Sequence, residues 1–218
     1  MNIFRLIGDM LHLVAIIILL SKMLRGRTAA GLSLKTQFLF ALVFTTRYLD
    51  LFTTYISLYN TTMKLFFLAT SYHICYLMRF KSPWKASYDR ENDTFGLRYI
   101  LIPCAVLALL FHRESLHMFQ EVLWTFSEYL EAVAILPQIM LMEETERYDA
   151  LTSHYLFCLG AYRVFYIFNW IYRYVETGHV LWVSVIAGII QSLLYADFFY
   201  RYFKQVVRRA KQKYDLAK

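Results

Sequence analysis

Long apolar stretches with few helix breakers are the feature that most constrains this chain of 218 residues. Hydrophobic residues make up 59% of the sequence and aromatic residues 18%, and only three prolines and seven glycines interrupt it. A helix that crosses the hydrocarbon core of a bilayer needs about 20 mostly apolar residues. The sequence therefore predicts an all-α membrane protein of seven transmembrane helices, over residues 3–21, 35–56, 62–79, 98–112, 117–141, 151–174 and 180–203.

Basic residues outside these segments gather at one end of the predicted helices. Clusters follow the first and third segments and end the chain, whereas Lys64 and Arg113 fall at the opposite end. Cytosolic loops carry the excess of Lys and Arg, so we predict a membrane domain over residues 1–203 with a lumenal N-terminus, and a basic cytosolic tail over residues 204–218. The tail cations that we single out are Lys204, Arg208, Arg209, Lys211 and Lys213.

The pair Pro137-Gln138 interrupts one long apolar segment. Proline frees a backbone carbonyl, which predicts a kink where one half of the protein hinges against the other. With the odd number of segments, this favours two three-helix bundles joined by a linker helix. Transporters built from two parallel repeats share that arrangement and bind substrate at the repeat interface.

Four arginines, Arg5, Arg47, Arg163 and Arg173, fall inside the apolar segments. A charge at that depth costs at least about 2.5–3.5 kcal/mol on insertion scales, so it is usually kept for binding or transport and faces a wet interior. The four arginines are therefore a candidate anion site.

Other polar residues share helix faces with these arginines. Residues seven apart lie on nearly the same face of a helix, which aligns Arg5 with His12 and Arg47 with Thr54. The sequence predicts a water-accessible cavity lined by cations, carboxylates and aromatic groups. Further candidates at three-to-four spacing are Glu121, Trp124, Glu128 and Glu131, then Tyr162, Tyr166, Asn169 and Arg173, with Asp197 deep in the last segment.

Plainer interpretations of single residues remain open. Arg5 and Arg173 fall near helix ends, where an arginine side chain extends to the membrane interface. His12 alone is more often a hydrogen-bonded core histidine than a functional one.

Structural ion pairs are a further alternative for the two deeper arginines. Arg47 would pair with Asp50, and Arg163 with Glu131. Because a conformational switch also uses such a pair, the residues alone do not separate the two interpretations.

Several features argue against other protein classes. Cys75, Cys104 and Cys158 fall in separate apolar segments, which indicates core residues rather than a disulfide framework or zinc site. The sequence shows no nucleophile motif or metal-ligand cluster, so we predict no enzyme activity, cofactor or metal. The excess charge lies beside a membrane, which favours contact with lipid over nucleic acid.

Blocks along residues 1 to about 203 resemble the KDEL receptor family, the ER lumen protein-retaining receptors. They are MNIFRL (1–6), ALVFTTRYLD (41–50), ISLYNT (56–61), WTFS (124–127), YLEAVAILPQ (129–138) and ADFFY (196–200). The resemblance implies a seven-helix fold similar to SWEET and PQ-loop transporters. It implies a receptor of the ER and cis-Golgi membrane that binds the C-terminal Lys-Asp-Glu-Leu or His-Asp-Glu-Leu signal of soluble ER proteins and returns them in COPI vesicles.

The signal carries three negative groups, and guanidinium forks match carboxylates well. The resemblance assigns Arg47 and Tyr48 to the terminal carboxylate, Arg5 and Trp170 to the glutamate, Arg173 to the aspartate, and Asp50, Glu121 and Trp124 to the basic first residue.

The resemblance makes His12 the pH sensor. An anionic ligand beside it favours the imidazolium, so affinity is greatest at acidic pH and falls toward neutrality. Capture in the acidic Golgi and release in the ER follow by linkage. The residues implied to rearrange on binding, as the last helix moves and exposes the basic patch to the COPI coat, are Glu131, Tyr162, Arg163, Tyr166, Asn169 and Asp197.

The chain departs from the family pattern in three places. Glu128 stands where the resemblance leads us to expect an apolar residue. The turns at 112–115 and 178–181 lack expected acidic positions, which leaves the preference between Lys and His in the signal open. The tail is basic but holds no strict terminal dilysine motif. A PQ-loop-type transporter of small solutes is the alternative function.

Overall fold

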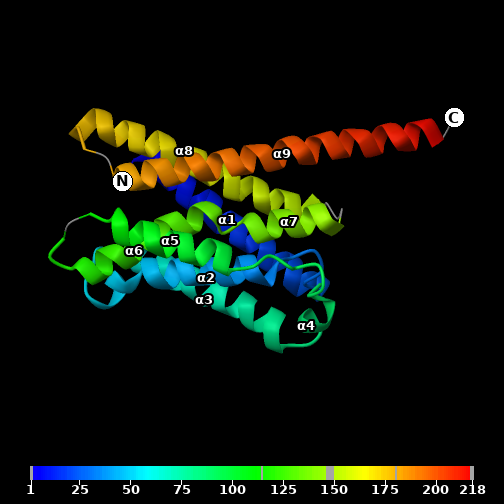
Figure 1. Ribbon diagram of the computed structural model, residues 1–218, viewed down its shortest axis with the longest axis horizontal. Coiled ribbons are helices and arrows are strands. Elements are labelled where there is room, and N and C mark those ends of the chain that lie inside the picture. The colour runs from blue at the N-terminus through cyan, green and yellow to red at the C-terminus, as the bar shows by residue number, and fades with distance from the viewer. Residues whose placement is uncertain (1, 114, 146–149, 180, 217–218) are drawn as a thin grey trace.

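The helices of the protein run side by side along one long axis (Figure 1). The computed structural model describes residues 2–113, 115–145, 150–179 and 181–216. All regular structure within these residues is helical, which confirms the predicted all-α class. In chain order the elements are α1 (Ile3–Gly26), α2 (Leu34–Arg47), the 3₁₀ helix η1 (Leu49–Phe52), α3 (Leu58–Phe80), α4 (Trp84–Ser87), α5 (Arg98–Leu110), α6 (Met118–Val133), α7 (Leu136–Thr145), α8 (Ala150–Thr177) and α9 (Trp182–Leu216).

The outer faces of the helices are apolar. Along α5, for example, Ile102, Leu109 and Leu110 are each more than 60% exposed. Two segments, Ile3–Gly26 and Trp182–Lys204, are long and apolar enough to cross a bilayer, with mean hydropathies of 2.3 and 1.5. Such exteriors suit lipid better than water, because monomeric soluble proteins rarely expose large contiguous apolar patches. The helices therefore fit a membrane protein.

The helix expected over residues 35–56 is shorter than the sequence predicted. It ends at Arg47, after which η1 and an extended segment lead to Ser57, the N-cap of α3. The β-branched Thr53 and Thr54 disfavour helix because their side chains crowd the preceding turn. Arg47 is thus the last residue of a helix rather than a residue in the middle of one.

The segment expected as one helix over residues 117–141 is two helices, α6 and α7, separated at residues 134–135. Pro137 has no N–H to continue the backbone ladder. The next N–H, that of Gln138, donates to Thr36 Oγ1 of α2 at 2.9 Å and to the Ile135 carbonyl at 3.0 Å. The break occurs where the sequence predicted a kink.

The side chain of Gln138 fixes this break to the start of α2. Its Oε1 accepts from the Ser33 N–H and its Nε2 donates to the Gly31 carbonyl, both at 2.9 Å. Gln138 is fully buried. These buried hydrogen bonds oppose rotation of α7 against α2, so the break between α6 and α7 is held in one geometry and is not a free hinge.

Asp93, in the loop before α5, extends this buried network. Its carboxylate accepts from Ser33 Oγ at 3.0 Å, from the Lys35 N–H at 3.3 Å and from the Tyr88 hydroxyl at 2.7 Å. Burial, followed by the bond to Asp93, raises the pKa of Tyr88, so this hydroxyl stays a donor at physiological pH. The carboxylate therefore holds the cap of α2 and the 81–97 loop together.

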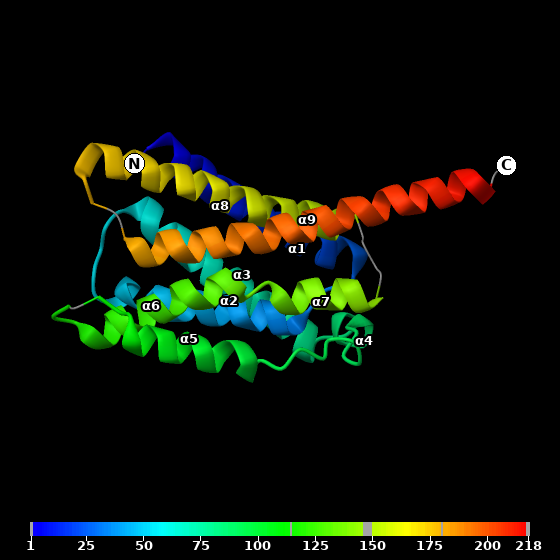
Figure 2. The same ribbon diagram turned by 45° about the horizontal axis from the view of Figure 1, so that its top comes forward.

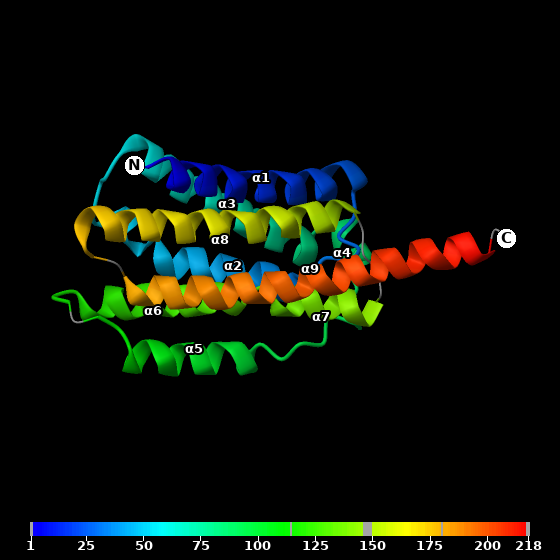
Figure 3. The same ribbon diagram turned by 90° about the horizontal axis from the view of Figure 1, so that it is seen from above.

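Helices from the two halves of the chain pack against one another in the bundle (Figure 3). α1 packs most extensively on α8, and α2 lies against both α3 and α6. α9 packs on α6 and α8, while α5 packs on α6 at the outer edge (Figure 3). No contiguous half of the chain forms the bundle alone.

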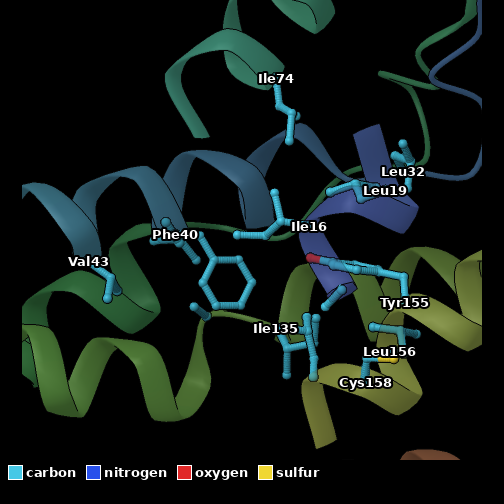
Figure 4. Packing of buried hydrophobic residues seen from close by; sticks show 14 of the residues in the cluster. Ile16, Leu19, Leu32, Phe40, Val43, Ile74, Ile135, Tyr155, Leu156 and Cys158 are labelled. Atoms are coloured by element: carbon cyan, nitrogen blue, oxygen red, sulfur yellow. The ribbon is translucent and has the colours of Figure 1, made fainter. Parts of the chain in front are cut away.

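A single apolar cluster fills the centre between these helices (Figure 4). Ile16 of α1, Phe40 of α2 and Tyr155 of α8 meet there with Ile135, which lies in the break between α6 and α7. Cys104 and Cys158 are buried free thiols of the core, as the sequence indicated.

α9 continues without a break past the predicted domain boundary at residue 203 and extends beyond the other helices (Figure 1). Lys204 is exposed. The side chains of Arg208, Arg209, Lys211 and Lys213 lie outside the part of the chain that the structure describes.

We expect Asp93→Asn to lower the stability of the protein by about 1–3 kcal/mol, because an amide cannot accept from all three donors. A thermal unfolding scan in detergent measures this as a lower midpoint. Asp89→Asn is the matched control, since Asp89 lies in the same loop and its carboxylate accepts from the exposed Asn92. A D93N midpoint equal to that of D89N would show that the network does not stabilise the fold.

Candidate functional site

A cavity of about 630 Å³ opens between α1, α2, α3, α6, α8 and α9. It contains all of the side chains predicted for signal binding and pH sensing, and all of the predicted switch residues except Asp197. The sequence therefore identified most of its polar wall. The predicted residues in the wall are Arg5, His12, Arg47, Tyr48, Asp50, Glu121, Trp124, Glu131, Tyr162, Arg163, Tyr166, Asn169, Trp170 and Arg173.

Glu131 of α6 is the central carboxylate of the cavity and is only 1% exposed. One of its oxygens accepts from the Tyr162 hydroxyl and lies 2.6 Å from Arg163 Nη2. Its other oxygen accepts from Arg47 Nη1. A buried carboxylate costs several kcal/mol unless it is paired, and here two guanidinium groups compensate it. The ion pair between Arg163 and Glu131 that the sequence suggested is present.

Arg47 directs all three nitrogens of its guanidinium group at α6. Nε donates to Ser127 Oγ at 3.0 Å, Nη1 donates to Glu131, and Nη2 lies 3.0 Å from Glu128 Oε1. The expected ion pair of Arg47 with Asp50 is wrong. Because α2 ends at Arg47, Asp50 belongs to η1 and faces α3 instead.

Asp50 pairs with Lys64 of α3, at 2.5 Å between Oδ2 and Nζ. The distribution of basic residues predicted Lys64 at the lumenal end of the bundle, and it was not among the predicted site residues. It is buried and lines the cavity wall. Its position inside an apolar segment was the signal that should have revealed it.

His12 is buried among aromatic side chains. Its ring stacks on Tyr162 at a centroid distance of 4.4 Å and lies 4.7 Å from the Phe67 ring. Glu131, Arg163 and Arg47 line the same cavity. The imidazole therefore shares this wall with a buried carboxylate and two guanidinium groups.

Asp9 is a cavity residue that the site prediction missed. Its carboxylate accepts from the hydroxyls of Tyr166 and Tyr59, the latter at 3.1 Å, and its Oδ2 lies 4.0 Å from Arg5 Nε. The four-residue spacing from Arg5 places both on one helix face and was sufficient to find it. Asp9 links α1 to α3 and α8.

The mouth of the cavity holds less constrained charges. The side chain of Arg5 is 44% exposed and Arg173 is also exposed. Glu121 lies 3.9 Å from Arg113, which is 65% exposed. Solvated side chains of this kind reorganise at little cost, so the mouth adapts to a ligand more readily than the deep wall.

Two aromatic side chains of the cavity wall pack against glycines. A β-carbon at Gly188 of α9 would lie 2.5 Å from the Trp170 ring, and one at Gly8 of α1 would lie 2.7 Å from Tyr166. Only glycine permits these approaches. Trp170 and Tyr166, which both line the cavity, therefore pack closely against α9 and α1.

Asp197 is not a cavity residue. Its side chain is 54% exposed and pairs with Arg201 at 2.8 Å, while Arg201 also lies 3.0 Å from Glu143 of α7. The sequence grouped Asp197, deep in the last segment, with the cavity residues, but its side chain occupies an exposed face of α9 near the tail. The position of a residue along a helix does not determine which face of the helix the residue occupies.

The cavity suits an extended ligand with several negative groups. Arginines line both its mouth and its depth, and guanidinium groups bind carboxylates through paired hydrogen bonds. Among the residues that the structure describes, no cluster of three or more His, Cys, Asp or Glu side chains has the geometry to hold a metal ion.

Comparisons with known proteins agree with this geometry. The sequence model of the family described as ER lumen protein retaining receptor matches residues 28–173. The chain is 56% identical over 211 residues to the ER lumen protein-retaining receptor erd-2.2 of Caenorhabditis elegans, with 97% of each chain covered. It is 56% identical to the ER lumen protein-retaining receptor of Petunia hybrida, with 94% of each covered. For that of Drosophila melanogaster the identity is 53%, covering 97% of this chain and 98% of the relative.

We expect Glu131→Gln to destabilise the protein by about 3–5 kcal/mol, because it leaves two buried guanidinium groups without a shared counter-charge. The thermal midpoint in detergent should fall by more than about 5 °C. Glu121→Gln is the control, since its pair with the exposed Arg113 contributes at most about 1 kcal/mol. Equal midpoints for E131Q and E121Q would contradict a structural role for the buried carboxylate.

Proposed function

The chain belongs to the ER lumen protein retaining receptor family, and from this premise we propose that it binds the C-terminal retrieval signal of soluble ER proteins in the cavity. The family is one of retention receptors and not of enzymes. The observation that carries the proposal is the joint presence of Arg5, Arg47 and Arg173 in one cavity wall. A tetrapeptide signal of the Lys-Asp-Glu-Leu or His-Asp-Glu-Leu type offers three negative groups to three guanidinium groups.

The dimensions of the cavity support a peptide ligand. Its volume of about 630 Å³ lies within the range of about 300–1,000 Å³ that is usual for ligand pockets. A small-solute transporter, the alternative function, is not favoured by the named relatives, all of which are retention receptors.

The depth of each side chain suits the order of groups in the signal. Arg47 with Tyr48 lies deeper than Arg5 and Arg173 and would receive the terminal carboxylate. Arg5 with Trp170 would bind the penultimate glutamate, and Arg173 the aspartate nearer the mouth. The basic first residue of the signal would meet the remaining acidic and aromatic side chains of the wall, Asp50, Glu121 and Trp124.

The N-terminus and the start of α6 lie at one end of the bundle, and the C-terminal end of α9 lies at the other (Figure 2). Arg5 is in the first turn of α1, Glu121 in the first turn of α6, and Arg173 in the last turns of α8, all at the end that holds the N-terminus. We propose that this end faces the lumen of the ER and Golgi and that the tail is cytosolic. A lumenal mouth is the orientation that a receptor for lumenal proteins requires.

The packing order supports a two-bundle architecture. α3 lies against α1 and α2, and α9 lies against α6 and α8, so that the third helix of each group contacts the first two. Between the groups, α1 packs on α8 and α2 on α6, which is a reciprocal arrangement. We propose that α5 is the linker helix between the two groups. The seven longest helices would then form the two-repeat fold of SWEET and PQ-loop transporters.

Binding at acidic pH and release at neutral pH follow from the surroundings of His12. A bound signal adds negative charge beside the imidazole and favours its protonated form, so protons and signal bind together. The contacts of Glu131 with Tyr162 and Arg163 would rearrange as the signal takes Arg47, with Tyr166 and Asn169 following on α8. Through α9, which carries Asp197 and the tail, the change would reach the COPI coat and return the complex to the ER.

Titration of the purified protein with a Lys-Asp-Glu-Leu peptide and its carboxamide-capped form tests the binding assignment. The capped peptide should bind about 10–100-fold more weakly, because a charge-assisted hydrogen bond contributes about 1.5–3 kcal/mol. Arg47→Lys should weaken binding of the free peptide and reduce this preference, since an ammonium lacks the fork. Arg98→Lys, outside the cavity, is the control. Equal affinity for the two peptides in the wild-type protein would disprove the proposal.

His12→Ala should reduce the ratio of signal affinities at about pH 5.5 and 7.5 by about tenfold, because one group that gains a proton with the ligand is lost. His73→Ala is the control, since His73 is exposed on α3 and does not line the cavity. An unchanged ratio in H12A would remove His12 from the mechanism.

A further inference from the structure

We propose that Glu128 is a tethered competitor of the signal, whose carboxylate occupies the guanidinium group of Arg47 until the terminal carboxylate of the signal displaces it. The inference rests on the proposed function and extends it to a residue to which the resemblance assigns no role. Glu128 is 7% exposed and lies one turn before Glu131 on the cavity face of α6.

The hydrogen bonds of Arg47 indicate where displacement occurs. Nε and Nη1 are engaged by Ser127 and Glu131, whereas Nη2 lies 3.0 Å from Glu128 Oε1 without a hydrogen bond to any described residue. A carboxylate binds guanidinium best through two adjacent nitrogens. Because the contact of Glu128 has the charge but not the geometry of such a bond, it is the contact that an incoming carboxylate replaces.

The balance of charges in the deep wall has a second consequence for binding of the signal. The deep wall contains two guanidinium groups, Arg47 and Arg163, and two carboxylates, Glu128 and Glu131, which balance when His12 is neutral. A third carboxylate from the signal leaves one uncompensated negative charge in a buried site, which is costly. The cluster therefore takes up one proton when the signal binds.

Of the other cations that line the cavity, Lys64, Arg5 and Arg113 lie beside Asp50, Asp9 and Glu121, and Arg173 is exposed. Arg47 contacts Glu128 from α2, and the same wall holds His12 of α1, Tyr48 of α2, Arg163 of α8 and Ser184 of α9, which does not titrate. α5, which also packs on α6, places no side chain in the cavity among the residues that the structure describes. An apolar residue in place of Glu128 would leave one guanidinium charge free for the signal at any pH.

The test is calorimetric titration of the full-length protein with the Lys-Asp-Glu-Leu peptide at about pH 5.5 and 7.5, in buffers of different ionisation enthalpy. Glu128→Gln should tighten binding at pH 7.5 by about 10–100-fold, tighten it less at pH 5.5, and reduce proton uptake on binding by about one. Glu128→Asp, which keeps the charge, should retain the proton uptake of the wild type. Glu176→Gln removes one charge from the exposed end of α8 outside the cavity and should change affinity less than about threefold.

Each result separates this inference from the proposed function. If E128Q binds no tighter at neutral pH and takes up as many protons as the wild type, Glu128 is not a competitor, although a carboxylate-dependent receptor remains. An equal gain for the carboxamide-capped peptide would also overturn the inference, because the gain would not arise at the terminal carboxylate. Should E128Q fail to fold, the His12→Ala protein provides the measurement: the inference requires residual uptake of about one proton there, and no uptake would contradict it.

Discussion

The shared burial of Glu131 between two guanidinium groups is the interaction on which the rest of the structure depends. The carboxylate belongs to α6, Arg47 to α2, and Arg163 with Tyr162 to α8, while Gln191 of α9 donates to the Tyr162 hydroxyl at 3.3 Å. In lipid, apolar contact between helices gives no transfer free energy, so packing and buried polar bonds decide how helices associate. This cluster fixes four helices around the cavity floor.

The same cluster makes the protein responsive to a ligand. A buried ion pair is stable only while its charges balance, so an added carboxylate cannot enter without moving a charge or a proton. Glu128 brings the deep wall to neutrality before any ligand is present. On the proposed function, affinity, pH dependence and conformational change would be three consequences of one charge balance rather than of separate sites.

Rigid and adaptable parts of the molecule are clearly divided. Gln138 and Asp93 fix the break between α6 and α7 to the start of α2 at the end of the bundle away from the mouth. The charges at the mouth are solvated and weakly paired. Because the break is braced, movement on binding should arise from the α8 and α9 contacts around Glu131 rather than from the proline.

The sequence by itself determined the helical class, the positions of most helices and the membership of the cavity wall, because hydrophobic runs, helical spacing and buried charge are local properties of the chain. Only the tertiary structure decided which charged side chains pair with one another. Spacing aligned Arg47 with α2's polar face but could not show that Glu128 and Glu131 reach it while Lys64 takes Asp50. It also decided that Asp197 faces outward. Pairing depends on how helices distant in sequence are rotated against one another, and no local pattern records that rotation.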